Sequence, residues 1–190
     1  MKTVASRRFL CMAGALAAAG TLAACSKPEV SPVARGEYLV TMGGCDDCHT
    51  PKVFGPNGPD LDKARRLSGH PAGEKLPELP VSIIGPEQWG AVTNNHLTAW
   101  FGPWGVSFAA NLTADASGLG GWTEDNFIQA MRTGKHAGSG RPILPPMPWM
   151  NFARMTDDDL RAVFAYLKSL PPVSNAVPAP IPPGAAPAAK

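Results

Sequence analysis

The sequence predicts a helical domain that is interrupted by one long irregular insert. Three segments carry helix signals, at residues 32–42, 123–134 and 156–168, whereas residues 51–110 carry no long periodic pattern. Gly and Pro are frequent, at 20 and 21 of 190 residues, and they predict much irregular backbone between the helices. The chain is long enough for one domain with a hydrophobic core.

The first predicted helix spans residues 32–42. Ser31 can cap its N-terminus, and Pro32 fits the first helical position, where the backbone N–H has no helical partner to lose. The pair Gly43-Gly44 ends the helix. Its apolar residues form only a loose face: Val33, Tyr38, Leu39 and Met42.

The other two predicted helices each begin after a capping threonine. Thr123 is followed by two acidic residues, which favour a helix N-terminus, and Gly134 ends that helix. Thr156 is followed by three aspartates, and Pro171-Pro172 blocks continuation of the last helix. The last helix is the clearest of the three because its apolar residues repeat at i, i+3, i+4 and i+7: Leu160, Val163, Phe164 and Leu167.

The insert at residues 51–110 is punctuated by Gly, Pro and Asn. Residues 81–84 and 100–108 are candidates for short strands. Three tryptophans, at positions 89, 100 and 104, favour an ordered insert over a disordered one. Long loops in compact domains are usually functional or disordered, so we expect this insert to wrap a functional site.

The motif Cys45-Asp46-Asp47-Cys48-His49 is the most informative part of the chain. It is a single C-x-x-C-H, the spacing of a c-type haem attachment site. Two thiols one helical turn apart can each form a thioether with a haem vinyl group, and the adjoining histidine can then serve as the proximal iron ligand. A bare C-x-x-C could instead be redox-active or half of a zinc site, but the histidine and the export signal described below argue against both. We therefore expect one covalent haem c, bound by Cys45, Cys48 and His49.

The second axial ligand of such an iron must come from a distant segment. Met147 is the first choice, because Pro145, Pro146 and Pro148 restrict the loop around it. A restricted loop can hold a soft sulfur atom at little cost in conformational entropy. The sequence therefore predicts His/Met ligation by His49 and Met147.

Other residues compete for the iron or could surround it. Met150 is the nearest rival to Met147, whereas Met155 precedes a helix cap and fits a packing role. A bis-histidine site, which would lower the reduction potential, stays open through three histidines: His70, His96 and His136. Three further residues could contact the haem or its propionates, or could be ordinary core and surface residues: Trp122, Trp149 and Arg132.

Residues 1–24 have the pattern of an export signal. Lys2, Arg7 and Arg8 form a positive start, and the apolar run that follows is too short and too rich in Gly and Ala for a membrane span. The stretch Leu22-Ala23-Ala24-Cys25 resembles a bacterial lipobox, which implies cleavage before Cys25 and lipidation of its thiol. Two or more acyl chains would anchor the protein stably to a membrane. The alternative is an ordinary secretory signal that contains a cysteine.

Charge and cysteine use fit an exported chain without a nucleic-acid partner. Removal of residues 1–24 takes three of the 17 basic residues and none of the 15 acidic ones, which leaves a net charge near −1, and there is no basic stripe. Cys11 would leave with the signal, Cys25 would take lipid and the other two cysteines would take haem, so no thiol is left for a disulfide. The expected units are a signal at 1–24, a tether at 25–31, a domain at 32–173 and an extended or mobile Pro/Ala-rich tail at 174–190.

Further short segments follow the haem motif in a fixed order: Asn111 to Asp115, Gly118 to Thr123, Ala130 to Gly134, Pro146-Met147-Pro148-Trp149, Met155 to Leu160 and Ala165 to Val173. With these segments, which span roughly residues 33–173, the chain resembles bacterial class I-type monohaem cytochromes c. The resemblance implies an all-α cytochrome c domain whose N- and C-terminal helices pack near each other. It also places the iron-ligating methionine in the Pro-Met-Pro-Trp segment, at Met147.

The resemblance further implies an electron carrier rather than an enzyme. We expect a periplasmic, lipid-anchored protein whose partners are redox proteins, such as a dehydrogenase or a terminal oxidase. An alternative with the same chemistry is an electron-transfer subunit of a membrane-associated dehydrogenase complex, in which the insert and the tail would be docking surface. A haem peroxidase or gas-binding protein is a second alternative, and it would need an open or labile sixth coordination position.

Overall fold

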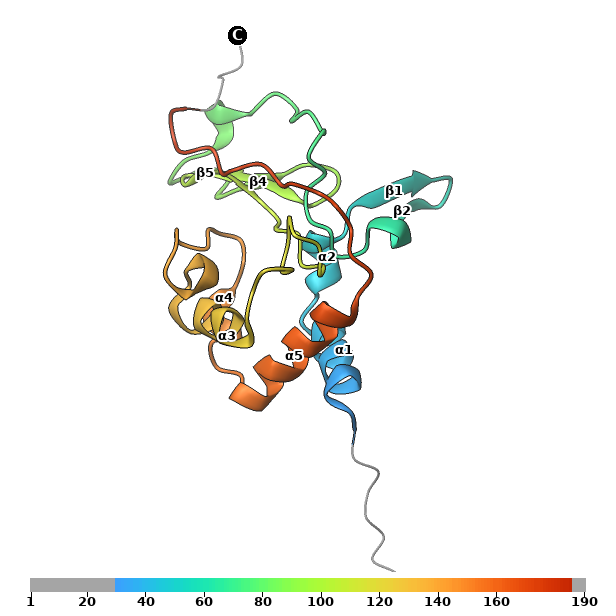
Figure 1. Cartoon of the computed structure of the whole chain (residues 1–190). Coiled ribbons are helices and arrows are strands. Elements are labelled where there is room, and N and C mark those ends of the chain that lie inside the picture. Colours follow the sequence, from blue (N-terminus) through green and yellow to red (C-terminus); the bar gives the residue numbers. More distant parts are fainter. Residues whose placement is uncertain (1–29, 186–190) are drawn as a thin grey trace, which may run out of the picture.

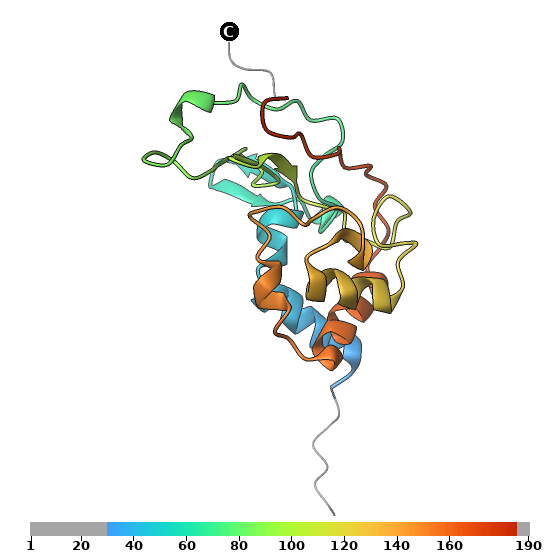
Figure 2. The same ribbon diagram turned by 90° about the vertical axis from the view of Figure 1, so that its left-hand side faces the viewer.

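A computed structural model describes residues 30–185 of the chain. Within these residues, five α-helices and two small antiparallel sheets form two layers, with most helices in the lower half of Figure 1 and the sheets in the upper half. Figure 2, turned by 90°, shows the same layering. The expected signal at 1–24 and the expected lipidation site Cys25 lie outside the described residues.

The helices expected from the sequence are present close to their predicted bounds. α1 spans Pro32–Met42, α3 spans Glu124–Thr133 and α5 spans Asp157–Ser169. The predicted caps accept backbone N–H groups through their side chains: Ser31, Thr123 and Thr156. Gly134 ends α3 with a left-handed φ of 66°.

Helices α1 and α5 cross in close contact, so the two ends of the domain lie together as expected. Gly36 of α1 permits this approach. A Cβ at that position would lie 2.0 Å from the carbonyl oxygen of Ala162 and 2.7 Å from Cβ of Tyr166. The crossing therefore depends on the absence of a side chain at Gly36.

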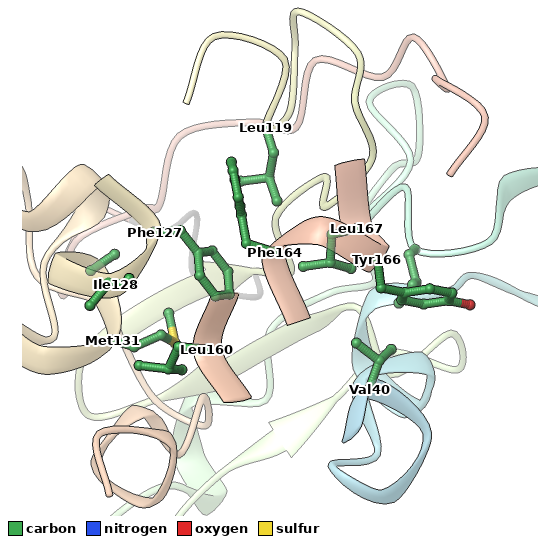
Figure 3. Packing of buried hydrophobic residues seen from close by; sticks show 11 residues of the cluster. Val40, Leu119, Phe127, Ile128, Met131, Leu160, Phe164, Tyr166 and Leu167 are labelled. Carbon is green, nitrogen blue, oxygen red and sulfur yellow. The ribbon is translucent and has the colours of Figure 1, made fainter. Parts of the chain in front are cut away.

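The main hydrophobic core lies where α3 and α1 pack around α5 (Figure 3). Phe127 of α3 and Phe164 of α5 stack with ring centroids 5.4 Å apart. The short helix α4 (Trp149–Phe152) follows on the α3 side, and Trp149 lies so close to Gly134 that a Cβ there would be 2.4 Å from the indole ring. The other large buried residues of this cluster are Val40, Leu67, Leu119, Ile128, Met131, Leu160, Tyr166 and Leu167.

The expectation of an all-α fold is wrong, because the insert forms strands. β1 (Lys52–Gly55) pairs with β2 (Gly58–Leu61), and a second sheet has the order β3-β4-β5. Its strands are β3 (Val92–Thr93), β4 (Ala99–Gly102) and β5 (Gly105–Phe108). The candidate strand at 81–84 is instead the 3₁₀ helix η2 (Val81–Ile83), whereas the candidate at 100–108 is the β4-β5 hairpin. The remaining short helices are η1 (Lys63–Arg65) and η3 (His136–Gly138).

Both hairpins turn through the same pattern, Gly-Pro-x-Gly, at residues 55–58 and 102–105. Proline in the second position and glycine in the fourth are preferences of a tight β-turn. Gly58 and Gly105 have φ values of 99° and 89°, a region that residues with a side chain rarely adopt. The strands themselves are two to four residues long, too short for an alternating pattern to stand out in the sequence.

The C-terminal residues 174–185 form an extended segment that runs from the end of α5 to the second sheet (red in Figure 1). Ile181 exchanges two backbone hydrogen bonds with Val106 of β5, at 2.8 and 2.9 Å. The tail is therefore held against the edge of β5. No helix among residues 30–185 is both long and apolar enough to cross a membrane.

Candidate functional site

Helix α2 (Cys45–His49) presents the two cysteines of the motif as free, half-buried thiols. Gly44, with a φ of 64°, lets the chain turn from α1 into α2. Burial, together with the neighbouring Asp46, raises the pKa of Cys45 to about 11, and burial also raises the pKa of Cys48. Both side chains are therefore neutral thiols at pH 7.

His49 is buried, and one hydrogen bond orients its ring. Nδ1 lies 2.8 Å from the carbonyl oxygen of Ala110. Because a carbonyl oxygen can only accept, Nδ1 carries the proton and Nε2 keeps its lone pair. Burial lowers the pKa of His49 in spite of the Ala110 bond, so the ring is neutral at pH 7. A neutral imidazole with a free Nε2 and a carbonyl behind Nδ1 is the arrangement of a metal-ligating histidine.

The insert supports His49 through two segments that bond to each other. Gly69 N–H donates to the carbonyl oxygen of His49 at 2.8 Å. The next residue, His70, donates its backbone N–H to the carbonyl oxygen of Ala109 at 2.9 Å, directly before the carbonyl of Ala110 that orients the ring. A Cβ on Gly69 would lie 2.4 Å from the Ala109 oxygen, so the close approach of the two segments requires glycine there.

A network of charged and polar groups ties α2 to the insert and to α5. Asp46 accepts hydrogen bonds from Arg66 at 2.7 and 3.0 Å and from the Thr50 hydroxyl at 2.6 Å. Arg66 also donates to the Tyr166 hydroxyl of α5 at 2.5 Å. Burial alone would raise the pKa of Asp46, but the bonds from Arg66 and Thr50 outweigh it and hold that pKa below its usual value. The carboxylate is therefore ionised at neutral pH and fixes the first turn of α2.

Met147 is half-buried against the main core, and Cys45 packs against the same cluster. Its loop is anchored on both sides. The Ser107 hydroxyl of β5 donates to the Pro145 carbonyl oxygen at 2.5 Å, and Trp149 N–H donates to the Met147 carbonyl oxygen at 2.9 Å. The loop is therefore held by hydrogen bonds in addition to its prolines.

One short segment, residues 107–110, contacts the supports of both expected axial ligands. Ser107 bonds the loop that carries Met147, and Ala110 bonds the ring of His49. Since an extended chain rises about 3.3 Å per residue, the Cα atoms of Ser107 and Ala110 are at most about 10 Å apart. His49 and Met147 are 98 positions apart in the sequence. The structure nevertheless brings the groups that support them into one region.

The competing iron ligands are placed differently. Met150 is 61% exposed, whereas Met155 packs against the core, which suits the packing role expected of it. His96 already accepts the first backbone N–H of β1 at 3.0 Å. His136 packs edge-on against Trp122 with ring centroids 4.9 Å apart. Burial thus favours Met147 over Met150.

Arg132 and Trp149 shape the connection around the Met147 loop. The guanidinium of Arg132 donates to the carbonyl oxygens of Ala153 and Met155 and to the carboxylate of Asp157. Arg132 therefore holds the link between α4 and α5.

Asn175, in the tail, binds the segment at residues 68–72, which supports His49. Its side-chain Nδ2 donates to the carbonyl oxygens of Ser68 and His70 at 2.7 and 2.9 Å, and its Oδ1 accepts the Ala72 N–H at 2.9 Å. The sequence reasoning missed this role, because a single asparagine in a Pro/Ala-rich tail carries no pattern. It also missed Ala110, which acts through its main chain and so leaves no side-chain signal.

The residues present fit a covalently attached haem. The thiols are neutral, one imidazole is oriented with a free Nε2, and one thioether is half-buried on an apolar cluster. Neutral nitrogen and sulfur donors suit iron in a macrocycle and do not suit hard cations such as Mg²⁺ or Ca²⁺.

Comparison with known proteins points to the same cofactor. The chain is 33% identical over 153 residues to the cytochrome c subunit of alcohol dehydrogenase (quinone) from Gluconacetobacter polyoxogenes, across 77% of this chain and 26% of that protein. It is 28% identical over 146 residues to the gluconate 2-dehydrogenase cytochrome c subunit from Pantoea cypripedii, across 76% of this chain and 24% of the relative. These similarities support a c-type cytochrome, and they imply covalently bound haem c.

A further relative is named a diheme c-type cytochrome, from Cereibacter sphaeroides; it is 29% identical across 73% of this chain and 36% of its own length. No protein-family model matches the chain. The chain spans only a fifth to a quarter of the length of the dehydrogenase cytochrome subunits that it matches.

Proposed function

We propose that the chain is a c-type cytochrome that transfers electrons through one covalently bound haem with His49 and Met147 as axial ligands. The observation that carries the proposal is the orientation of His49, directly after the two thiols of α2, with Nδ1–H bonded to Ala110 and Nε2 free. When bound, the haem supplies the one-electron step, because its iron can be ferric or ferrous.

The residues of the chain have distinct roles in this proposal. Cys45 and Cys48 would hold the haem covalently, and the Nε2 lone pair of His49 and the sulfur of Met147 would bind its iron. Both ligands are held by anchored backbone, so their positions change little when an electron arrives or leaves. A small rearrangement favours fast electron exchange.

The support for a single haem is that the 190 residues contain one C-x-x-C-H. The support for a membrane anchor and a periplasmic location is the signal pattern of residues 1–24 with the cysteine that follows it. Mass spectrometry of the exported protein tests both proposals. We expect one haem mass and a diacylglycerol on Cys25. A second haem mass or an unmodified cysteine would contradict them.

The proposed partner is a membrane-associated dehydrogenase, from which the chain would accept electrons. Similarity to named cytochrome subunits of alcohol and gluconate dehydrogenases favours this partner over a terminal oxidase. Affinity purification of the full chain from its own membranes should recover a dehydrogenase polypeptide. Recovery of an oxidase alone would contradict this proposal and would assign a terminal oxidase as the partner.

A redox titration tests the function itself. The full chain, matured in a host that attaches c-type haem, should titrate as one reversible one-electron couple and should not bind carbon monoxide. Carbon monoxide binding to the ferrous protein would instead indicate an open sixth position, as a peroxidase or gas-binding protein requires.

A further inference from the structure

Lys52, the first residue of β1, reaches back to helix α2 and binds its end. Its ammonium group donates to three carbonyl oxygens, those of Thr50 at 2.6 Å, Asp47 at 2.9 Å and Asp46 at 3.3 Å. The last carbonyl groups of a helix have no partner within the helix, and a lysine nearby can supply the missing donors. Lys52 therefore caps the helix that carries the two thiols and His49.

The three bonds require the charged form of the Lys52 side chain. An ammonium group has three N–H donors and a neutral amine has only two, whereas Nζ has three carbonyl acceptors. Carbonyl oxygens carry no formal charge, so these bonds do not neutralise the ammonium. Of the neighbouring carboxylates, Asp46 is paired with Arg66 at 2.7 Å and Asp47 is exposed to solvent. Lys52 therefore holds a positive charge against the end of α2.

The backbone of Lys52 is held as well, so the side chain starts from a fixed point. Lys52 N–H donates to Nδ1 of His96 at 3.0 Å, and Lys52 lies opposite Leu61 in the β1-β2 ladder. The ring of His96 packs edge-on against Phe54 of β1, with centroids 5.5 Å apart. The insert thus positions Lys52 from one side, and α2 binds its ammonium group from the other.

The charge of Lys52 acts on the proposed attachment site. Burial and Asp47 raise the pKa of Cys48, whereas the nearby Lys52 ammonium acts in the opposite direction. Two of the carbonyl groups that Lys52 binds belong to the residues between the cysteines, Asp46 and Asp47. His49 is the last residue of the same helix. A charge fixed at this end of α2 therefore lies close to an iron that His49 binds.

We propose that the Lys52 ammonium is a positioning group whose fixed charge raises the reduction potential of the haem bound to α2. This inference rests on the proposed function and adds a residue that sets its driving force. Ferrous iron has one positive charge fewer than ferric iron, so a positive charge nearby favours reduction. Nearby charge and hydrogen bonds are the means by which a protein tunes a redox cofactor.

Substitution of Lys52 in the haem-loaded full chain tests the proposal. Lys52→Gln removes the charge and keeps N–H donors for the carbonyl groups of α2. The equilibrium constant for reduction should fall roughly three- to tenfold, which is about 30–60 mV at about 59 mV per tenfold change in a one-electron couple. Lys52→Arg keeps the charge and should stay close to the wild-type potential. The far-red thioether band should persist in both variants, because both proposed axial ligands remain.

Lys63→Gln is the matched control. Lys63 is exposed on η1, so this variant changes the net charge equally, at a position where solvent and salt screen it. Its potential should equal that of the wild type. An equal fall in Lys63→Gln would show a general effect of net charge and would overturn the proposal.

Three further results would overturn the proposal. The first is an unchanged potential in haem-loaded Lys52→Gln. The second is an equal fall in Lys52→Arg, because charge would then not be the cause. The third is loss of the thioether band in Lys52→Gln, because the shift would then come from an exchanged axial ligand.

Amine acetylation of the wild-type holoprotein gives a second measurement that needs no variant to fold. Acetylation requires a free lone pair, which the Lys52 ammonium exposes only after it loses a proton and breaks its bonds to the carbonyl groups. Lys52 should therefore react several-fold more slowly than Lys63, as measured by peptide mass spectrometry. Equal rates would overturn the inference. A wild-type protein without haem absorbance would instead overturn the proposed function, and its spectrum shows this before any variant is compared.

Discussion

Three side chains at the candidate site are neutral, one of them buried and two half-buried, and this property limits what they can bind. Burial raises the pKa of Cys45 to about 11 and lowers the pKa of His49. Met147 has no charge to lose. A set of neutral sulfur and nitrogen groups next to an apolar core suits iron in an organic ring and does not suit a hard cation such as Mg²⁺ or Ca²⁺.

The choice between two methionines can be tested directly. Met147→Ala should abolish the far-red absorption band that a thioether bound to ferric haem iron produces, because it removes the proposed ligand. Met150→Ala is the control, since Met150 is 61% exposed and should leave the band intact. The opposite pattern, with the band lost only in Met150→Ala, would assign the ligand to Met150.

Arg66 should stabilise the fold in a pH-dependent way. Its bonds to Asp46 hold the pKa of that carboxylate below the usual value, so the stabilisation is present above the unfolded pKa of about 4 and is lost as pH falls through the lower folded value. Arg66→Met should lower the free energy of unfolding by about 1–2 kcal/mol at pH 7.

Urea titrations at pH 7 and below pH 4 measure this difference. The gap between Arg66→Met and wild type should shrink at the acidic pH. Arg65→Met is the control, because Arg65 pairs with Asp62 at the surface and should change stability little at either pH. A gap that stays constant with pH would show that the arginine acts through packing alone.

At the scale of elements, the contact between α1 and α5 leaves no room for a side chain at Gly36. Gly36→Ala should lower the free energy of unfolding by about 1–3 kcal/mol, although alanine is the better helix former, because the new methyl group meets the Ala162 carbonyl. Gly121→Ala is the control, since no atom lies within 4 Å of a Cβ there. Equal denaturation midpoints for the two variants would contradict the close crossing.

The tail should stabilise the insert through the hydrogen bonds of Asn175. Asn175→Ala removes three hydrogen bonds to residues 68–72 and should cost about 1–3 kcal/mol. Amide hydrogen exchange at Gly69 and His70 should accelerate as their outer support is lost. Ser174→Ala, at an exposed neighbouring position, is the control. Unchanged amide exchange at Gly69 and His70 in Asn175→Ala would show that the tail does not stabilise the segment that supports His49.

Local signals predicted three helices but, of the strands, only the segment at residues 100–108, for a physical reason. A cap such as Thr156 and a stripe of apolar residues act within one helix, so they can be read from the sequence alone. The strands are stabilised by pairing between segments and are too short for periodicity. Their one local signal was the Gly-Pro-x-Gly turn, repeated at residues 55–58 and 102–105.

At the scale of the whole molecule, the candidate site is assembled from segments far apart in the sequence. The motif of α2, the support at residues 67–70, the segment at 107–110 and the loop at 145–149 meet between the two layers of Figure 1. The chemistry of Cys45, Cys48 and His49 could be predicted, because covalent attachment requires a fixed local spacing. The supporting contacts of Ala110 and Asn175 could not, because they depend on the folded arrangement.

The most direct test of the account is a pyridine haemochrome spectrum with an intact mass, taken on full chain matured in a host that attaches c-type haem. The account predicts a c-type spectrum and one haem bound through Cys45 and Cys48. Protein that is folded and exported but has no haem mass and no Soret absorbance would contradict it.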